Sequence, residues 1–589
     1  MRIGSPKNAR RRRVLAGLLA ISLTATACGG AKSSDKDGDG STLEDKNLTA
    51  AAGESGLEEA GAPVRGGSVV YGVEADSPSY CLAEGQLAIS GMLVVRAVYD
   101  TLTVPNAEGD YVPYLAKAIT PNDAYDEWTI ELRDGITFHN GTDLTAEVVK
   151  NNLDAYRGKY PGRSSLLFTF VLSNIDTIDV TGDLTLVVKT KVPWVAFPSY
   201  LYSSSRLGIM AQEQLDDENC AKNLIGTGPF KFEEWKENTS FKAVRNEDYW
   251  QIAPDGEPYP YLDAIEFRVS PDGQQRETAL QAGDLDIIHT TNAQTMGRKW
   301  AGMRDKGEVT MFVSEEQAEV AFLQLNNTKP PFDDLRMRRA MAMAADRDQI
   351  NQIMNDGLPT IANGPISSGT LGYTTDTGFP AYDKDAAKKL VDEYVKEGNK
   401  AEFVLTVTND PDVKKLGQLV QTRAKDIGVN VKIQTRDQAA LVTDAIARDY
   451  QAMTFRNYPG GDPDSLYVWF HSGNKEPADA PANPVNFAGI NDTEVDRLLD
   501  EGRSETDPAK RKALYEELNN RMGEQVFDLW TWFTPWAVVA QPNIHGILGP
   551  ALPGDDITKP VPAAGADDAH SPSLGLATAH SLIGLWKTN

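Results

Sequence analysis

The first 28 residues constrain this chain most, because they indicate that the protein leaves the cytoplasm before it folds. Four arginines, Arg10 to Arg13, precede an apolar run from Val14 to Ala27. A run of about 14 apolar residues is too short for a stable membrane-spanning helix and fits the core of a signal peptide. We therefore assign residues 1–27 to a cleaved signal peptide. The remainder, roughly 560 residues, is long enough to form several packed lobes.

The segment around Cys28 indicates how the exported chain is held. Small residues stand before Cys28, and Ala25–Gly29 resembles the lipobox of bacterial lipoproteins, with Ala25 where that pattern prefers leucine. The resemblance implies that Cys28 carries acyl chains and anchors the protein to the outer face of the cytoplasmic membrane. An ordinary cleaved signal or a short membrane anchor is the alternative. The arginine run does not separate the general export route from the twin-arginine route.

Residues 28–65 comprise this cysteine and a predicted linker. From residue 29 to 63 there is no aromatic residue, and Gly, Ala, Ser, Asp and Glu predominate. Such a composition cannot bury enough apolar surface to fold alone. We expect a flexible tether that ends at the β-branched strand segment after Gly66 and Gly67.

Net charge excludes several classes of partner. The formal charge is −26, and removal of the basic leader takes it to about −32, a charge that repels nucleic-acid phosphates and anionic headgroups. No further apolar run is long enough to span a bilayer. We expect no nucleic-acid binding, and membrane contact through Cys28 alone.

Two cysteines remain once Cys28 is assigned to the anchor. An even pair in an exported, oxidising setting favours a disulfide between Cys81 and Cys220. Two buried free thiols are the alternative.

Strand and helix patterns alternate along the body. Phe403–Val407 reads as a strand, and the apolar residues from Leu416 to Ile427 then fall on one helical face. Gly428 ends that helix, and Val429–Ile433 follows as a second strand. Asp507, followed by Pro508, is typical of a helix N-terminus. These units place the chain in the α/β class.

The sequence contains no recognisable catalytic set. The six histidines are scattered, no cysteine pair has zinc spacing, and there is no nucleophile elbow, phosphate-binding loop or dinucleotide motif in the right context. We therefore expect a binding protein with no catalytic residue, no metal site and no cofactor.

Ordered motifs along residues 66–548 resemble family 5 of the bacterial extracellular solute-binding proteins, the peptide, dipeptide and nickel-type receptors of ABC importers. Each motif alone is modest, whereas their order is specific. They are Val98–Leu102, Tyr111–Ala116, Trp128–Gly141, Gly226–Phe230, Arg245-Asn246 with Tyr249-Trp250, Leu280–Asp286, and Pro331–Ala340 with Asp346-Arg347.

The resemblance implies a two-lobed periplasmic-binding-protein-like fold of type II, the large peptide-binding class, with an inserted subdomain and a ligand cleft between the lobes. Lobe I would hold residues 66–90, 225–320 and 525–589. The inserted subdomain would run over 91–224 and lobe II over 321–524. Hinge closure over a solute would bury it from both sides.

The resemblance also suggests where ligand contacts lie. In peptide-binding members, an aspartate in lobe II pairs with the α-amine of the ligand. Aligned on Asp462-Pro463-Asp464, its place is taken by Pro459, unless a gap shifts Asp462 into that role, and Arg456 stands where a tryptophan is common. Arg456 is a planar donor fork suited to a carboxylate, phosphate or polyol, or else a solvated loop residue.

Nine residues are predicted to bind ligand, from both lobes. They are Gln86, Leu87, Ser90, Asn363, Arg456, Asn457, Tyr458, Tyr467 and Asn486. Aromatic side chains supply rigid walls with a polar tip. Of Tyr467, Trp469 and Phe470, at least one is expected to be core.

We therefore expect a monomeric, lipid-anchored receptor that captures a peptide or similar solute and delivers it to the permease subunits of an ABC importer. A non-peptide anionic or polyol ligand is the first alternative. The same fold used as a sensor or scaffold in the cell envelope is the second. An envelope hydrolase would need a nucleophile and base that the sequence does not reveal.

Overall fold

The computed structural model describes residues 61–165, 167–457, 460–473, 483–562, 570–573 and 575–588. The predicted signal peptide, Cys28 and residues 28–60 of the predicted linker lie outside these ranges. Arg65, which we assigned to the linker, is bound to the folded body, because its guanidinium donates two hydrogen bonds of 2.7 and 2.8 Å to the carboxylate of Asp255.

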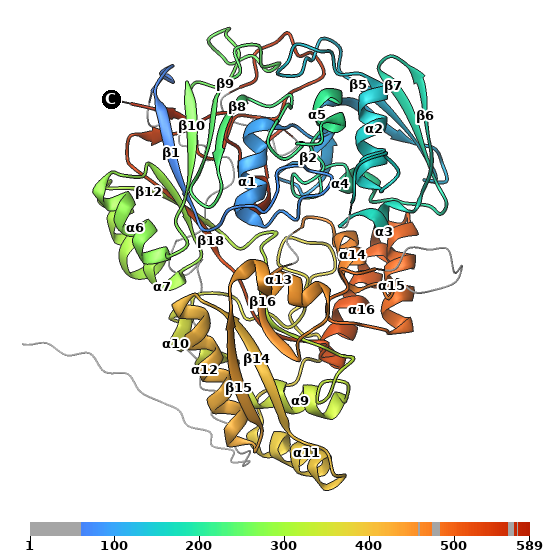
Figure 1. Ribbon diagram of the computed structural model, residues 1–589, viewed down its shortest axis with the longest axis vertical. Helices are drawn as coiled ribbons and strands as arrows, with labels where there is room; N and C mark the ends of the chain where they lie inside the picture. Colours follow the sequence, from blue (N-terminus) through green and yellow to red (C-terminus); the bar gives the residue numbers. More distant parts are fainter. Residues whose placement is uncertain are drawn as a thin grey trace, which may run out of the picture. The chain divides into compact units, whose positions relative to one another are not determined.

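Lobe I is built on a seven-stranded sheet in the order β12-β18-β11-β1-β10-β9-β8 (Figure 1). Its strands are β1 (Ser68–Val73), β8 (Phe230–Lys236), β9 (Ser240–Arg245), β10 (Ala264–Val269), β11 (Ile287–Thr290), β12 (Thr310–Ser314) and β18 (Trp536–Ala540). β1 is parallel to both of its neighbours, β10 and β11. The helices of this lobe are α1 (Ile89–Val98), α6 (Gly273–Ala282), α7 (Ala293–Thr295), the π-helix η1 (Met296–Trp300), α8 (Ala301–Arg304) and α17 (Leu576–Ala579), and β19 (Ile544–His545) pairs with β20 (Trp586–Lys587).

A subdomain is inserted between α1 and β8. Its four-stranded antiparallel sheet has the order β4-β5-β7-β6, and β2 pairs with β3 beside it. The elements are β2 (Thr103–Pro105), β3 (Tyr111–Pro113), β4 (Ala116–Pro121), β5 (Glu127–Leu132), β6 (Ile175–Gly182), β7 (Thr185–Thr190), α2 (Ala146–Tyr156), α3 (Thr169–Leu172), α4 (Phe197–Tyr200) and α5 (Gln212–Asp216). A disulfide joins Cys81, before α1, to Cys220, after α5. The bond fastens the end of the insertion close to its start. The predicted disulfide between Cys81 and Cys220 is confirmed.

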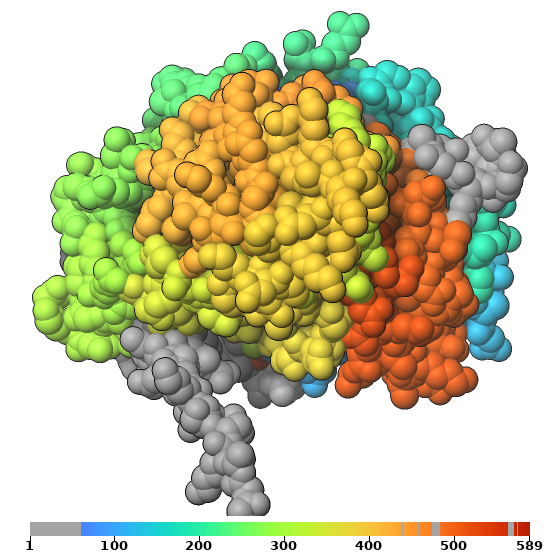
Figure 2. All heavy atoms as spheres, turned by 90° about the horizontal axis from the view of Figure 1, so that it is seen from below, coloured from blue at the N-terminus to red at the C-terminus, as the bar shows by residue number. Residues whose placement is uncertain are grey.

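Lobe II is built on a five-stranded sheet in the order β15-β14-β16-β13-β17. Its strands are β13 (Val320–Leu325), β14 (Glu402–Thr408), β15 (Asn430–Arg436), β16 (Ala452–Asn457) and β17 (Asp528–Phe533). Its helices are α9 (Leu335–Ala344), α10 (Arg347–Asn355), α11 (Lys384–Lys396), α12 (Pro411–Asp426), α13 (Gln438–Ile446), the 3-10 turn η2 (Pro463–Leu466), α14 (Tyr467–Phe470), α15 (Thr493–Ser504) and α16 (Pro508–Gln525). Lobe II occupies the centre of the face seen from below (Figure 2).

The chain passes between the two large sheets twice. It leaves lobe I between Ser314 and Val320 and returns between Phe533 and Trp536. The boundary expected at residue 525 therefore differs from the structure, because β17 pairs with β13 of the lobe II sheet. The boundary expected between residues 90 and 91 falls inside α1, a continuous helix that packs against β8 and β9 of lobe I.

Local sequence signals explain the strand-helix-strand unit of lobe II. Asp410 caps α12 by accepting from the backbone N–H groups of Asp412 and Val413, and Pro411 occupies the first turn. Gly428 follows the helix with φ +88°, a conformation that favours glycine. β14 and β15 are parallel on either side of this connection. The strand-helix-strand prediction for residues 403–433 is confirmed.

The core follows the same division. The largest apolar cluster joins the lobe I sheet to the subdomain and extends to Leu441 and Phe487 of lobe II, two others fill lobe II, and a fourth lies under the lobe I sheet around Trp300. Within the residues described above, no helix is both long and apolar enough to cross a membrane.

Candidate functional site

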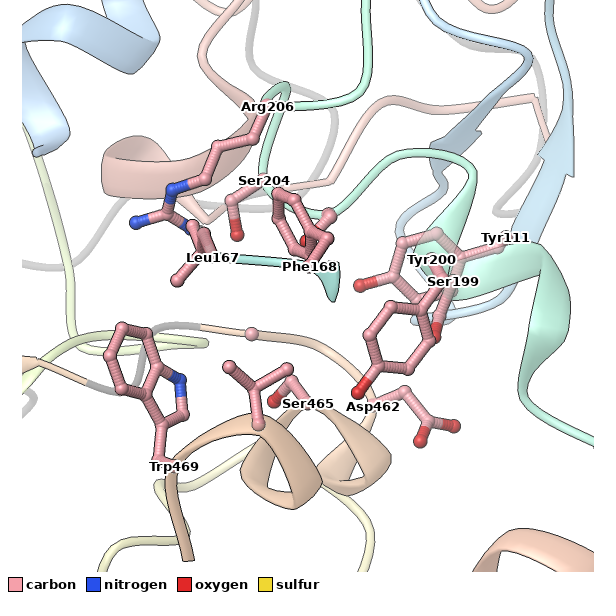
Figure 3. Close-up of a pocket in the computed structure, with 13 residues that line it drawn as sticks. Tyr111, Leu167, Phe168, Ser199, Tyr200, Ser204, Arg206, Asp462, Ser465 and Trp469 are labelled. Atoms are coloured by element: carbon pink, nitrogen blue, oxygen red, sulfur yellow. The ribbon is translucent and has the colours of Figure 1, made fainter. Parts of the chain in front are cut away.

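A pocket lies between the subdomain and lobe II (Figure 3). The cavity between its walls is small, about 30 Å³, and it opens to solvent. The subdomain wall consists of Tyr111, Leu167, Phe168, Ser199, Tyr200, Ser203, Ser204 and Arg206, and the lobe II wall of Gly460, Asp462, Ser465, Val468 and Trp469. Arg206 and Trp469 lie on one side in Figure 3, and Asp462 and Tyr200 on the other.

The loop after α4 presents the serines in an unusual conformation. Ser203, Ser204 and Ser205 have φ of 43°, 56° and 70°. A non-glycine residue in this left-handed region costs roughly 1–2 kcal/mol, so three in succession must be held by their surroundings. Ser205 is held by Arg96, whose Nε donates to its Oγ at 2.8 Å, while Ser203 and Ser204 line the pocket.

Asp462 shapes the opposite wall. It caps η2 by accepting from the N–H of Asp464 at 2.8 Å, and Pro463 follows in the first turn. Both oxygens of its carboxylate accept from the guanidinium of Arg511, at 2.8 and 2.9 Å. Burial alone would lower the pKa of Arg511, but the neighbouring Asp462 raises it above its ordinary value. The negative charge of Asp462 is thus compensated within lobe II.

Asp464 joins the two walls. Its buried carboxylate accepts from Arg503 of lobe II at 3.0 and 3.1 Å and from the indole Nε1 of Trp194 in the subdomain at 2.7 Å. The hydroxyl of Tyr200 donates to its backbone carbonyl at 2.7 Å. This buried network fixes the distance across one end of the pocket.

Arg206 carries the one positive charge that lines the pocket within the described part of the chain. Its Nε donates to the backbone carbonyl of Leu87 at 3.1 Å. Among the described residues, no carboxylate forms an ion pair with its guanidinium. Burial lowers the pKa of Arg206 to about 10, so that the side chain stays charged at neutral pH.

Arg456, at the end of β16, has a different environment. Its Nη2 donates to Glu74 of lobe I at 2.6 Å, and its Nε lies 2.7 Å from the carboxylate of Glu319. Its Nη1 reaches the hydroxyl of Thr291 at 3.3 Å, and the guanidinium carbon is 5.2 Å from the ring centre of Trp536. Glu319 and Trp536 lie at the two crossings between the lobes. Arg456 therefore forms an interlobe ion pair with Glu74 at the hinge.

Arg456, Glu74 and Glu319 shift one another's pKa values. Burial alone would raise the pKa of Glu74, but Arg456 and Arg276 outweigh it and lower the pKa to about 2. Burial raises the pKa of Glu319 above its ordinary value, and Arg456 opposes this. Burial alone would lower the pKa of Arg456, yet the two carboxylates raise it. The guanidinium of Arg456, which was predicted to bind ligand, is therefore paired with carboxylates of the protein itself.

The other predicted ligand residues of lobe II hold the lobe together. Asn363 accepts from Arg347 at 2.8 Å and donates to the carbonyl of Thr375. Asn486 is buried and exchanges hydrogen bonds with the backbone of Ile490. Asn457 is buried in β16, opposite Val320 of β13.

Tyr467 packs between the subdomain and lobe II without lining the pocket. Its ring stacks on Phe170 and His471, and its hydroxyl donates to Asp500 at 2.9 Å. Tyr458 lies outside the described residues.

In lobe I, the predicted segment reaches the pocket only indirectly. Gln86 and Leu87 precede α1, and the carbonyl of Leu87 accepts from Arg206. Ser90 is buried in the first turn of α1, with a side-chain oxygen that has no hydrogen-bond partner within the described chain. None of the eight predicted residues that the structure describes lines the pocket of Figure 3, whereas Asp462, retained as an alternative, does.

The missed residues come from segments far apart in sequence. Arg206 and Leu87 are 119 residues apart, and the lobe II wall begins more than 250 residues after Arg206. One local signal was available: the run Ser203-Ser204-Ser205-Arg206 combines hydroxyl donors with a cation, a common composition for an anion-binding loop.

Comparison with known proteins gives one family. Residues 110–479, more than half of the chain, match the family described as bacterial extracellular solute-binding proteins, family 5 middle. The chain is 25% identical to the oligopeptide-binding protein AppA of Bacillus subtilis over 576 residues, which cover 92% of this chain and 95% of AppA. It is also 25% identical to heme-binding protein A of Haemophilus influenzae over 517 residues, or 81% of this chain and 89% of that protein.

Solved structures show the same fold. AppA in complex with a nonapeptide superposes with a TM-score of 0.72 at 23% identity and covers 82% of this chain and 96% of its own. AgaA from A. tumefacien R10, in complex with agropinic acid, gives a TM-score of 0.73 at 23% identity, with 89% of this chain and 99% of its own covered. The fold is therefore a mixed α/β fold shared with these binding proteins.

Proposed function

We propose, since the chain belongs to family 5 of the bacterial extracellular solute-binding proteins, that it is the receptor subunit of an ABC importer and captures its solute in the pocket between the subdomain and lobe II. Members of this family bind solutes and are not enzymes. Capture by closure requires two bodies joined by a hinge, with the ligand surface divided between them.

The observation that carries the proposal is the division of the pocket. Arg206, Ser203 and Ser204 belong to the subdomain, and Asp462 and Trp469 belong to lobe II. The chain crosses between the sheets of lobe I and lobe II only twice within the described residues. Rotation about these two crossings would break the hydrogen bonds of Trp194 and Tyr200 to Asp464, separate the walls and expose the pocket to solvent.

The lobes are in contact at the crossings and away from them, as expected for a closed receptor. Near the hinge, Arg456 contacts Glu74. Farther out, the amide of Asn292 in lobe I donates to Asp412 of α12 at 3.3 Å, and Arg298 pairs with Asp356 after α10. Each contact joins side chains of different lobes and would break on opening.

The relatives suggest the range of ligands. AppA was solved with a nonapeptide and AgaA with agropinic acid. We infer that this receptor takes a short peptide or another small organic solute, with hydroxyl and aromatic groups of the pocket as its contacts.

Native mass spectrometry of the protein purified without denaturation tests the proposal. We expect a bound small molecule that denaturation releases, and titration of the released compound into the emptied protein by calorimetry should restore a 1:1 complex. Absence of any saturable ligand in extracts that contain peptides and organic acids would contradict a receptor function.

The anchor and the importer require separate tests. Cys28 is proposed to carry acyl chains, so the Cys28→Ser chain should move from the detergent phase to the aqueous phase in a phase partition, whereas the wild-type chain should stay in the detergent phase. Purified permease and ATPase subunits encoded beside the gene should bind the liganded receptor. Aqueous partition of the wild-type chain contradicts the anchor alone and leaves the receptor function standing.

A further inference from the structure

One leucine of lobe II is buried in an apolar cluster of lobe I. Leu358 follows α10 of lobe II, yet it belongs to the cluster around Trp300 and is only 2% exposed. Every other buried member of that cluster lies in lobe I, on or beside α6, β11, α7, η1, β12 and β18. No residue that lines the pocket of Figure 3 belongs to the cluster. This interlobe contact is therefore separate from the pocket.

A glycine in a π-helical turn makes room for Leu358. The turn is η1, in which the backbone N–H of Ala301 bonds to the carbonyl of Met296, five residues earlier. A β-carbon on Gly297 would lie 3.0 Å from Cδ1 of Leu358, which is tighter than ordinary packing. π-helical turns are rare and occur frequently at functional sites. Gly297 therefore forms one side of a socket, and its neighbours Met296 and Trp300 lie in the same apolar cluster.

A sharp turn of lobe II places Leu358 in this socket. Asp356 and Gly357 end α10 with φ of 58° and 73°, and Figure 1 shows α10 beside α7 of lobe I. The carboxylate of Asp356 pairs with Arg298 and accepts from Nε2 of Gln294 at 3.2 Å. An apolar centre with a polar rim is the usual anatomy of a specific protein interface. Lobe II thus docks on lobe I through a small interface of this kind.

The docked turn continues directly to the hinge. Thr360 donates its backbone N–H at 3.1 Å and its hydroxyl at 2.8 Å to the carboxylate of Glu315, which follows β12 at the first crossing. Its carbonyl accepts from the N–H of Phe533 at the second crossing, at 2.9 Å. Leu358 is two residues from Thr360, so both crossings fix where Leu358 meets Gly297.

Close packing makes such a contact sensitive to small displacements. A gap of about 1 Å already forfeits up to half of the dispersion attraction between two groups, so packed interfaces adopt discrete states. Rotation about the crossings would withdraw Leu358 and expose it, with its socket, to water.

Resting on the proposed receptor function, we propose that Leu358 and Gly297 form an apolar latch that holds the two lobes closed in the absence of ligand. A closed form that is already populated raises the apparent affinity for a solute, because the solute then supplies less of the free energy of closure. The latch would thereby tune binding from a place that no ligand touches.

The test measures the separation of the lobes without ligand. Spin labels at two exposed positions, Lys306→Cys in lobe I and Lys400→Cys in lobe II, report the interlobe distance by double electron–electron resonance. The labels are placed in the Cys28→Ser chain, in which Cys81 and Cys220 stay joined by their disulfide. Native mass spectrometry establishes that the labelled protein has been emptied of ligand.

Three variants are compared in this labelled chain. Leu358→Ala should raise the ratio of open to closed protein at least about tenfold, because it removes buried apolar surface that only the closed form has. Gly297→Ala should crowd Leu358 and open the lobes while the unfolding midpoint is kept or raised, since alanine favours a helix over glycine. Leu285→Ala is the matched control, because Leu285 is equally buried in the same cluster but belongs to lobe I. It should lower the unfolding midpoint and leave the distances unchanged.

Three results would overturn the latch. They are distance distributions in Leu358→Ala and Gly297→Ala identical to that of the wild type, an opening by Leu285→Ala as large as that by Leu358→Ala, and a wild-type chain that is already open without ligand. Each leaves the receptor function standing, because ligand capture is measured separately by native mass spectrometry.

Discussion

Two arginines near the interlobe boundary, Arg456 and Arg206, show how the same side chain can serve stability in one place and binding in another. Arg456 lies in regular strand β16 between two carboxylates, Glu74 and Glu319. Arg206 follows three left-handed serines and bonds to a carbonyl. A guanidinium whose charge is matched by two carboxylates inside the protein is not available to a ligand, whereas one without a carboxylate partner is.

Removal of Arg456 should give the largest effect. Arg456→Met leaves Glu74 and Glu319 without their shared cation, and the side chain of Glu319 is only 8% exposed. Breaking a buried ion pair by removing one partner is strongly destabilising, so we expect a loss of about 3 kcal/mol in the free energy of unfolding. Urea denaturation followed by tryptophan fluorescence measures it.

The matched control is Arg436→Met at the end of β15, where an exposed pair with Asp444 contributes at most about 0.5 kcal/mol. Equal losses in the two variants would show that the Arg456 cluster contributes no more than a surface pair, and the contrast with Arg206 would fail.

Acid should weaken the same cluster. The pKa of Glu74 in the folded state, about 2, lies below its ordinary value of 4.5. Its stabilising contribution is therefore complete above pH 4.5 and is lost as the pH falls toward 2. With allowance for partial exposure, we expect about 2 kcal/mol more acid-induced loss in the wild type than in Glu74→Gln.

Glu319 acts in the opposite direction, because its pKa is raised and its protonation in acid favours the folded state. The comparison with Glu74→Gln removes most of this contribution, since burial, the main cause of the raised pKa of Glu319, acts in both proteins. Parallel stability curves between neutral pH and pH 3 would contradict the assignment of the shift to Glu74.

The amino-acid sequence predicts local elements of secondary structure, but it does not reveal the charge partners of the two arginines. The helix capped by Asp507 follows from capping signals that act over a few residues. Arg456, expected to be a ligand-binding fork or a loop residue, lies instead in strand β16. Glu74, however, is 382 residues from Arg456. No local pattern tells a paired arginine from an unpaired one, because the partner is chosen by the fold.

The same limit applies to the pocket. Its walls come from Tyr111, from residues 167–206 and from residues 460–469, which meet only when the subdomain packs against lobe II. Family resemblance implied two lobes, but the return to lobe I expected at residue 525 lies between Phe533 and Trp536 in the structure. It could not show that Tyr467 stacks on Phe170 outside the pocket.

Asp462→Asn should convert a compensated arginine into an uncompensated one. Arg511 would keep its place beside Asp462 but lose its charged partner, at a cost of about 1.5 kcal/mol in unfolding free energy. The pocket lining would lose the negative charge of Asp462, so an acid ligand should bind severalfold more tightly. Urea denaturation and calorimetry measure the two effects. Weaker binding of the acid would show that Asp462 itself contacts the ligand.

Ser204→Gly should have the smallest effect on the free energy of unfolding, and it should raise it. The reason is that Ser204 lies in the strained left-handed loop before Arg206. At φ +56° glycine is favoured over serine, and relief of this strain should raise the free energy of unfolding by about 0.5 kcal/mol. The variant also loses a hydroxyl beside Arg206, so binding of an acid ligand should weaken by about threefold. Ser465→Gly, in the lobe II wall and at the regular turn η2, is the control and should lose stability instead.

A stability gain without weaker binding would leave the strain of the serine loop unexplained by the ligand. A loss of stability in Ser204→Gly would mean that the contacts of the serine side chain outweigh the strain of its backbone.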